Sequence, residues 1–130
     1  MEKKIISTKM APGAIGPYSQ AVRVGEMLYV SGQIPLDPET MEIVGDGIAE
    51  QTKQVMDNLM QILTASGADA KSVVKTTCFL SDMSNFASFN EVYGGYFKKD
   101  APARACVEVS RLPKDVLVEV EAVALLGQQT

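Results

Sequence analysis

The sequence predicts a single α+β domain in which two helices cover one face of a β-sheet. This prediction rests on two observations. Short segments with two-residue alternation, typical of strands, occur near both ends of the chain, and two longer segments in the middle have apolar residues at helical spacing. Read in order, the elements are β-β-β-α-β-α-β-β. The length suits one domain with a hydrophobic core, spanning residues 1–130.

The first third of the chain predicts three strands and a long loop. Gly25 and Glu26 form a two-residue hairpin loop, because Gly25 stands where a type II′ turn needs glycine. The loop after the third strand contains two prolines and two glycines, and loops of this length in compact domains are often functional. The predicted strands span residues 3–8, 18–24 and 27–31, and the loop spans residues 35–47.

Two amphipathic helices are predicted in the middle of the chain, separated by a strand. The first has an apolar stripe, and the second has an aromatic stripe that we expect in the core rather than in a cofactor site. Gly94 and Gly95 lie inside the second helix, where each costs roughly 1 kcal/mol against Ala, so close packing is expected to require them. The helices span residues 48–66 and 82 or 84 to about 97, the strand spans 72–80, and the aromatic stripe is Phe86, Phe89, Tyr93 and Phe97.

The stretch Pro102–Leu126 predicts a β-hairpin with a polar, proline-containing turn. Both arms alternate, and directly opposed residues of an antiparallel pair lie on the same face. If the all-apolar faces of the two arms coincide, one register pairs Cys106 with Glu119 and Arg104 with Glu121. A guanidinium, a thiol and two carboxylates are then expected on one face of the sheet.

This polar patch has two interpretations. It can be an exposed ion pair between Arg104 and Glu121, which is common and weak. It can also be a site for a small anion, because the planar fork of Arg matches a carboxylate. Apolar side chains alternate with the glutamates of the last strand, which favours the anion site; they are Leu117, Val123 and Leu125. Two helices leave this face uncovered, which predicts a homo-oligomer with the patch at or beside a subunit interface.

Composition narrows the classes of function. The net charge is −4 and the sequence has no long basic run, so a surface that neutralises many phosphates is not expected. The chain contains no His, which excludes Ser-His and Cys-His pairs and removes the commonest metal ligand. The sequence has no phosphate-binding loop, dinucleotide fingerprint, zinc spacing or nucleophile elbow, so neither a cofactor nor a metal is predicted.

The sequence also predicts a cytoplasmic protein. Its N-terminus has no apolar segment long enough for a signal peptide, and no segment has the length of a membrane span. Cys78 and Cys106 are far apart and form no CxxC pair, so both are expected to be free thiols in a reducing compartment.

Several segments make the chain resemble the RidA/YjgF family of reactive enamine/imine deaminases. They cover residues 16–22, 31–35, 74–80, 89–90 with Tyr93, and the stretch that begins with residues 102–104 and ends with residues 119–122. The resemblance implies a chorismate-mutase-like α+β fold and a homotrimer with active sites between subunits. It also implies hydrolysis of 2-aminoacrylate and 2-iminobutanoate, released by pyridoxal-phosphate-dependent dehydratases, to 2-keto acids and ammonia.

The same resemblance implies roles for individual residues. Arg104 is expected to bind the substrate carboxylate, and Glu119 to position the attacking water. Ala105 stands where family members often have Ser, and its predicted face points away from Arg104. The Glu119 pKa must suit proton transfer near neutral pH, and burial and Arg104 move that pKa in opposite directions. Further positions that line the family's pocket are occupied by Tyr18, Ser31, Gly32, Asn90 and Cys106.

Two other functions stay open at this point. One is a regulatory protein that binds a small ligand in the same pocket without turnover, which fold and pocket alone do not separate from a deaminase. The other is the endoribonuclease or translation-inhibitor activity with which proteins of this family are also described. The net charge of −4 and the absence of His weigh against an RNA-directed activity.

Overall fold

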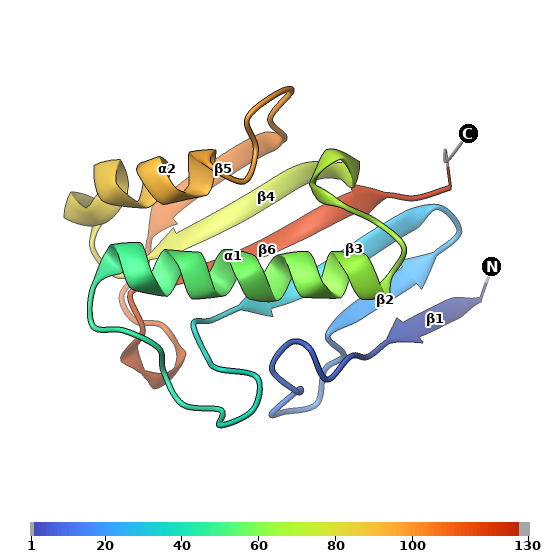
Figure 1. The fold of residues 1–130 in the computed structure, drawn as a ribbon, viewed down its shortest axis with the longest axis horizontal. Helices are drawn as coiled ribbons and strands as arrows, with labels where there is room; N and C mark the ends of the chain where they lie inside the picture. Colours follow the sequence, from blue (N-terminus) through green and yellow to red (C-terminus); the bar gives the residue numbers. More distant parts are fainter. Residues whose placement is uncertain (1, 128–130) are drawn as a thin grey trace.

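The computed structural model describes residues 2–127 and confirms the predicted α+β fold and element order. One layer is a six-stranded sheet, and two helices lie on one of its faces (Figure 1). The strands are β1 (Lys3–Ile6), β2 (Ala21–Val24), β3 (Met27–Gln33), β4 (Val73–Leu80), β5 (Ala103–Glu108) and β6 (Val118–Leu125), and the helices are α1 (Ile48–Ala65) and α2 (Phe86–Gly94). None of the helices in the described part of the chain is long and apolar enough to cross a membrane.

The strand order in the sheet is β1-β2-β3-β6-β4-β5. All neighbouring pairs are antiparallel except β4 and β5, which are parallel. The last strand in the sequence, β6, therefore lies inside the sheet, whereas β5 forms one edge and β1 the other. The predicted hairpin between β2 and β3 is present, and Gly25 at its turn has a positive φ of 60°.

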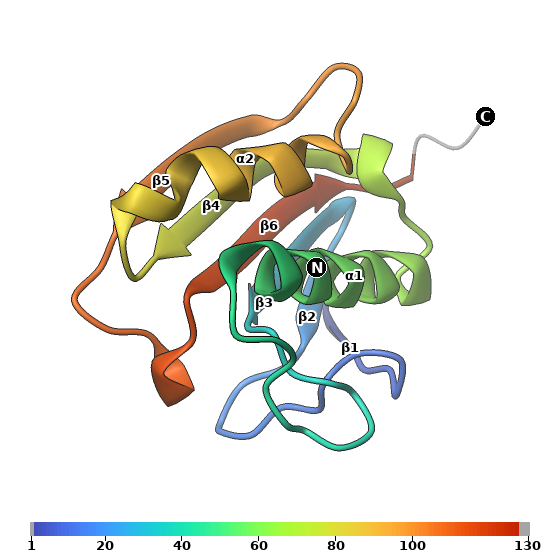
Figure 2. The same ribbon diagram turned by 60° about the vertical axis from the view of Figure 1, so that its left-hand side comes forward.

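The prediction of a hairpin over Pro102–Leu126 is wrong, because β4 lies between the two arms. β5 pairs with one side of β4 and β6 with the other. The connecting segment, residues 109–117, passes the end of β4, where Val109 N–H donates to the Leu80 carbonyl at 2.9 Å and Ser81 N–H donates to the Leu117 carbonyl at 3.1 Å. Figure 2 shows this segment reaching beyond the end of the sheet before β6 begins.

The hydrophobic core lies between the sheet and the helices. The apolar stripe of α1 packs against the face of β6 on which every second residue is buried, as the alternation of β6 predicts. α1 ends at Ala65, one residue before the predicted end, with Ser66 as its C-cap and Gly67 following at a φ of 81°. The fully or almost fully buried residues of the two elements are Val55, Met56, Leu59, Ile62 and Leu63 in α1, and Val118, Val120, Ala122 and Ala124 in β6.

The second helix is shorter than predicted. α2 ends at Gly94 instead of about Phe97, and Gly95 is its C-cap residue. A Cβ at Gly94 would meet nothing within 4 Å, so the expectation that close packing requires both glycines is wrong for Gly94. The two glycines instead stand where the helix stops. Phe89, Tyr93 and Phe97 are buried as predicted, whereas Phe86 is 36% exposed.

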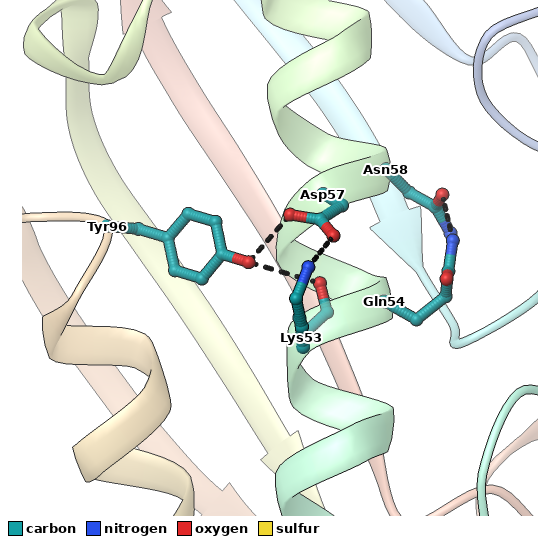
Figure 3. Close-up of polar contacts among 5 residues, drawn as sticks. All are labelled: Lys53, Gln54, Asp57, Asn58 and Tyr96. Carbon is teal, nitrogen blue, oxygen red and sulfur yellow. Dashed lines mark hydrogen bonds and ion pairs between the residues drawn. The ribbon is translucent and has the colours of Figure 1, made fainter.

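Buried polar side chains of α1 hold the long loop after β3. Asn58 donates to the carbonyls of Leu36 at 3.0 Å and Ile34 at 3.3 Å, and it accepts a hydrogen bond from Gln54 at 2.9 Å (Figure 3). Gln51 donates to the Gly45 carbonyl at 3.0 Å and accepts from Leu117 N–H at 2.8 Å, two residues before Glu119. One helix thus fixes both the loop and the start of β6.

Besides the loop after β3, α1 also contacts the segment that follows α2. The Tyr96 hydroxyl donates to Asp57 Oδ1 at 2.6 Å (Figure 3). Asp57 also forms an exposed ion pair with Lys53, with 2.6 Å between Nζ and Oδ2. These contacts connect the two helices on the covered face of the sheet.

Candidate active site

Four of the predicted site residues line one cleft on the face of the sheet opposite the helices. The cleft has a volume of about 390 Å³ and lies between β3, β6 and two loops. We call Tyr18, Ser31, Gly32 and Glu119 the carboxylate half-site. The complete lining is Ile15, Tyr18, Ser31, Gly32, Ile34, Pro113, Glu119 and Glu121.

A β-bulge shapes the floor of this cleft. Val30 pairs with Ala122 and Gln33 with Val120, so that Ser31 and Gly32 of β3 face one residue of β6. Bulges of this kind bend a strand and often occur beside active sites.

The Glu119 side chain lies directly over Gly32. A Cβ at position 32 would overlap Glu119 Oε2 and lie 2.9 Å from Glu119 Cδ. The absence of a side chain at Gly32 therefore makes room for the carboxylate.

Ser31 and Tyr18 are held by local hydrogen bonds. The Ser31 hydroxyl donates to the Ser19 carbonyl at 2.6 Å and ties the bulge to the segment before β2. The Tyr18 hydroxyl accepts from Ile15 N–H at 3.3 Å, and the Tyr18 ring stays half exposed as a wall of the cleft. Both residues line the cleft.

The surroundings of Glu119 in the cleft raise its pKa. Burial raises the Glu119 pKa above its ordinary value of 4.5, and the nearby carboxylate of Glu121 raises that pKa further. Among residues 2–127, no hydrogen bond or ion pair from the same chain engages the Glu119 carboxylate. The group is therefore available to a water or a substrate, with a pKa moved toward neutrality.

Arg104, Asn90 and Cys106 form a second group, which we call the guanidinium half-site. Arg104 Nη1 donates to Asn90 Oδ1 at 2.7 Å. This is the one hydrogen bond of the Arg104 side chain within the described residues, so the other guanidinium N–H groups remain for an anion. Cys106 lies two residues further along β5, on the same face of the strand.

The aromatic stripe of α2 also orients Arg104. The guanidinium carbon lies 5.0 Å from the ring centre of Tyr93, 5.4 Å from that of Phe86 and 5.9 Å from that of Phe89. Tyr93 is fixed in turn by a 2.7 Å hydrogen bond between its hydroxyl and that of Thr76. Sequence reasoning assigned these rings to the core alone. Their helical spacing with Asn90 was the available signal, because residues 86, 89, 90 and 93 share one face of a helix.

Both cysteine thiols are poor nucleophiles in this environment. Burial raises the Cys78 pKa to about 12. Burial also raises the Cys106 pKa, and the positive charge of Arg104 offsets only part of that effect. Both thiols are free, as the sequence predicts. Cys106 thus contributes shape and backbone groups to the guanidinium half-site rather than a thiolate.

The two half-sites lie on opposite faces of the sheet. Arg104 pairs with Thr76 and Cys106 with Cys78, on the face that the helices cover. Glu119 pairs instead with Phe79, and Glu121 with Thr77, on the open face.

The predicted pairs Cys106–Glu119 and Arg104–Glu121 are therefore wrong, and so is the interpretation as an ion pair between Arg104 and Glu121. Of the seven predicted site residues, one cleft gathers Tyr18, Ser31, Gly32 and Glu119, and the covered face gathers Asn90, Arg104 and Cys106.

Within residues 2–127, no group of three or more His, Cys, Asp or Glu side chains is placed to hold a metal ion. The chemistry that the described residues offer is an oriented guanidinium on one face and a carboxylate of raised pKa on the other. Together they suit an anionic substrate and a proton transfer.

Comparison with known proteins identifies the family. Residues 8–126 match the family described as Endoribonuclease L-PSP. A RutC family protein of Pyrococcus abyssi is 56% identical over 124 residues, covering 95% of this chain and 98% of the relative. The human 2-iminobutanoate/2-iminopropanoate deaminase is 50% identical over 128 residues, covering 98% of this chain and 93% of that protein.

A solved structure agrees with this result. The structure of E. coli TdcF with bound serine superposes with a TM-score of 0.91 at 45% identity and covers 95% of this chain and 99% of that chain. The chain belongs to the RidA/YjgF family, whose members also carry the L-PSP and RutC names.

Proposed function

We propose that this protein is a 2-iminobutanoate/2-iminopropanoate deaminase, which hydrolyses reactive imines to 2-keto acids and ammonia. The observation that carries the proposal is the Glu119 carboxylate, which has no hydrogen-bond or ion-pair partner among residues 2–127, is partly buried and has a raised pKa. Two relatives support the choice of substrate. The human protein that is 50% identical bears the name of this activity, and TdcF is described with bound serine, which is an amino acid with an α-carboxylate.

The complete site is proposed to lie between subunits of a homotrimer. One chain holds Arg104 and Glu119 on opposite faces of its sheet, so a site that uses both residues needs two chains. The open face also exposes apolar side chains, including Tyr29 at 49% and Leu125 at 40% exposure. Apolar surface of this kind favours a closed symmetric assembly.

The proposed reaction needs few groups. The Arg104 fork binds the substrate carboxylate, while Asn90 and the aromatic rings of α2 hold the guanidinium in place. Glu119 accepts a proton as water attacks the electrophilic imine carbon, which gives a carbinolamine. Glu119 returns that proton to nitrogen, which completes the neutral carbinolamine. The carbinolamine hydroxyl then gives its own proton to nitrogen through Glu119, the C–N bond breaks, and ammonia leaves as the keto group forms. Water supplies the oxygen atom of the keto group, so the proposed reaction needs no cofactor.

A coupled assay tests this function. A pyridoxal-phosphate-dependent dehydratase generates the imine in the cuvette, and formation of the 2-keto acid is followed with and without the purified protein. We expect the protein to accelerate this step above spontaneous hydrolysis. Absence of acceleration together with tight binding of the keto acid would instead support the regulatory binding protein.

The first prediction concerns the oligomer. We expect light scattering at micromolar concentration to give about 42 kDa, three times the 14.0 kDa chain mass. The physical reason is that a trimer covers the apolar open face and joins the two half-sites. A monomeric mass would contradict both the trimer and the location of the site between subunits.

A second prediction concerns RNA, since the matched family is described as an endoribonuclease. With a net charge of −4, we expect weak binding of generic RNA at physiological salt. Fluorescence anisotropy with a labelled single strand measures this. Sub-micromolar affinity with a steep salt dependence, or RNA cleavage that disappears in Arg104→Ala, would contradict the expectation.

A third prediction concerns pH. Glu119 must be ionised to accept a proton, so kcat/KM should fall as the pH falls through its raised pKa. Glu121→Gln removes one cause of the raised Glu119 pKa and leaves the larger cause, burial, so the acidic limb of the kcat/KM profile should move to lower pH.

The raised Glu119 pKa also links folding stability to pH. Because the folded-state pKa is raised, the stability that Glu119 contributes is present below the unfolded-state pKa and is lost as pH rises through the folded-state value.

The pH profile of kcat/KM on purified trimer checks this prediction. Glu42→Gln is the matched control, because it removes an exposed carboxylate in the loop after β3, outside the cleft. An acidic limb at the same pH in wild type and Glu121→Gln would show that Glu119 does not control it.

A further inference from the structure

The segment between β5 and β6 contains an unusual backbone conformation. Two consecutive residues that are not glycine, Lys114 and Asp115, have a φ of 57° each. Left-handed conformations are uncommon for such residues, because the Cβ crowds the neighbouring carbonyl. They persist where the surrounding structure enforces them, and they concentrate at functional sites.

Two kinds of contact enforce this conformation. Leu112 and Val116 are buried and anchor the turn on both sides. Arg111 and Asp115 then close it with a two-pronged ion pair, 2.5 Å from Nε to Oδ1 and 3.0 Å from Nη2 to Oδ2. Exposed pairs are usually weak, and bidentate geometry is the exception in which they do fix a conformation.

The strained turn presents Pro113 to the cleft that holds Glu119. If Arg104 binds the substrate carboxylate and Glu119 acts at the imine carbon, the substrate side chain is left to face the apolar part of the lining. That part consists of Ile15, Ile34 and Pro113. Apolar walls of this kind discriminate between substrates that differ by one methylene.

We propose that the Arg111–Asp115 ion pair is a positioning device that holds Pro113 as a wall of the cleft and thereby limits the length of the substrate side chain. This proposal rests on the proposed function and deepens it. The ion pair does not touch the substrate. It acts through the backbone of the turn, so its loss should change discrimination between substrates rather than remove the reaction.

The test compares two substrates that differ by one methylene, 2-iminopropanoate and 2-iminobutanoate. We expect Asp115→Asn to change the ratio of their kcat/KM values by roughly threefold or more, in favour of the longer substrate. Asn tolerates left-handed backbone, so this variant removes the ion pair without adding strain. Asp115→Gly should change the ratio in the same direction while raising the melting temperature, because Gly adopts positive φ freely. If the ion pair only stabilised the fold, a variant with a raised melting temperature would not also show a changed substrate ratio.

Two control variants match these changes elsewhere in the chain. Lys53→Gln removes another exposed ion pair with i,i+4 spacing, and Asp100→Gly relieves another positive φ, of 51°. Neither residue lines the cleft. Both controls should keep the wild-type ratio, and a matching shift in either one would overturn the proposal.

Calorimetry separates failure of this proposal from failure of the deaminase assignment. The affinities for pyruvate and 2-ketobutyrate are measured on the same variants, since they need no turnover. If wild type binds both keto acids but hydrolyses no imine, the deaminase assignment fails. The ratio of the two keto-acid affinities in the Asp115 variants then still tests whether the ion pair limits side-chain length. If Asp115→Asn and Asp115→Gly keep the wild-type ratios in turnover and in binding, the ion pair does not set side-chain length.

Discussion

Glu119→Gln should lower turnover by roughly 10²–10⁴-fold while leaving the affinity for 2-ketobutyrate close to that of wild type. The substitution nearly preserves size and hydrogen-bonding capacity, and it keeps the side chain over Gly32, but it removes the proton acceptor. The coupled assay measures turnover and calorimetry measures binding. If Glu119→Gln keeps full activity, the base is a different group, and Glu121 in the same cleft becomes the next candidate.

Arg104 variants should behave differently from Glu119→Gln. Arg104→Ala should lose both binding and turnover, because the guanidinium is proposed to hold the substrate carboxylate in the ground state and in the transition state. Arg104→Lys keeps the charge but loses the fork, including the donor to Asn90, so it should recover little. Each variant is first checked for the trimeric mass. Normal binding and turnover in Arg104→Ala would remove the carboxylate-binding role.

Mixing two inactive variants should restore activity. Arg104→Ala chains keep Glu119, and Glu119→Gln chains keep Arg104. Because one chain places these residues on opposite faces of its sheet, an intact pair can form only between two chains. Random co-assembly at equal amounts leaves about a quarter of the interfaces with both residues intact, so the mixture should reach about a quarter of wild-type activity.

The control for this experiment is Glu119→Gln mixed with a double variant that carries both substitutions. That mixture contains no intact Glu119, so it should stay inactive at the same trimeric mass. Failure of the first mixture to regain activity, despite verified co-assembly, would place both residues of a working site in one chain.

The sequence predicted correctly which side chains share a face within β5 and within β6, but it predicted neither the neighbours of these strands nor that Arg104 and Glu119 lie on opposite faces of the sheet. Alternation in β5 and β6 shows which side chains share a face, and it does so whether or not the two strands touch. A polar connection that contains Pro113 looks like a hairpin turn, although it passes the end of β4. The assumptions that the two arms pair directly and that their apolar faces coincide then placed Arg104 on the same face as Glu119. Sequence separation is short between β5 and β6, and the insertion of an earlier strand between them leaves no local signal.

Strand alternation pointed to Arg104, Cys106 and Glu119, the resemblance added the other candidate site residues, and the grouping of all of them required the structure. Gly32 at the end of a predicted strand is one place where a local signal existed, because glycine in a strand often marks a bulge or a close approach. The structure shows both, with the bulge at Ser31 and Gly32 and the carboxylate of Glu119 above. The strained turn at Lys114 and Asp115 had no such signal, since neither residue type demands a positive φ.

The position of β5 at the edge of the sheet has a consequence for the solubility of the unassembled chain. An edge strand carries a row of unpaired backbone groups that can pair with another edge and start aggregation, and charged side chains protect against this. β5 is exposed at most of its positions, and its two charged residues are Arg104 and Glu108. Arg104 is thus placed to protect the free chain from aggregation, in addition to its proposed role in substrate binding. Loss of its charge, which Arg104→Lys avoids, removes one of the two protecting charges on this edge.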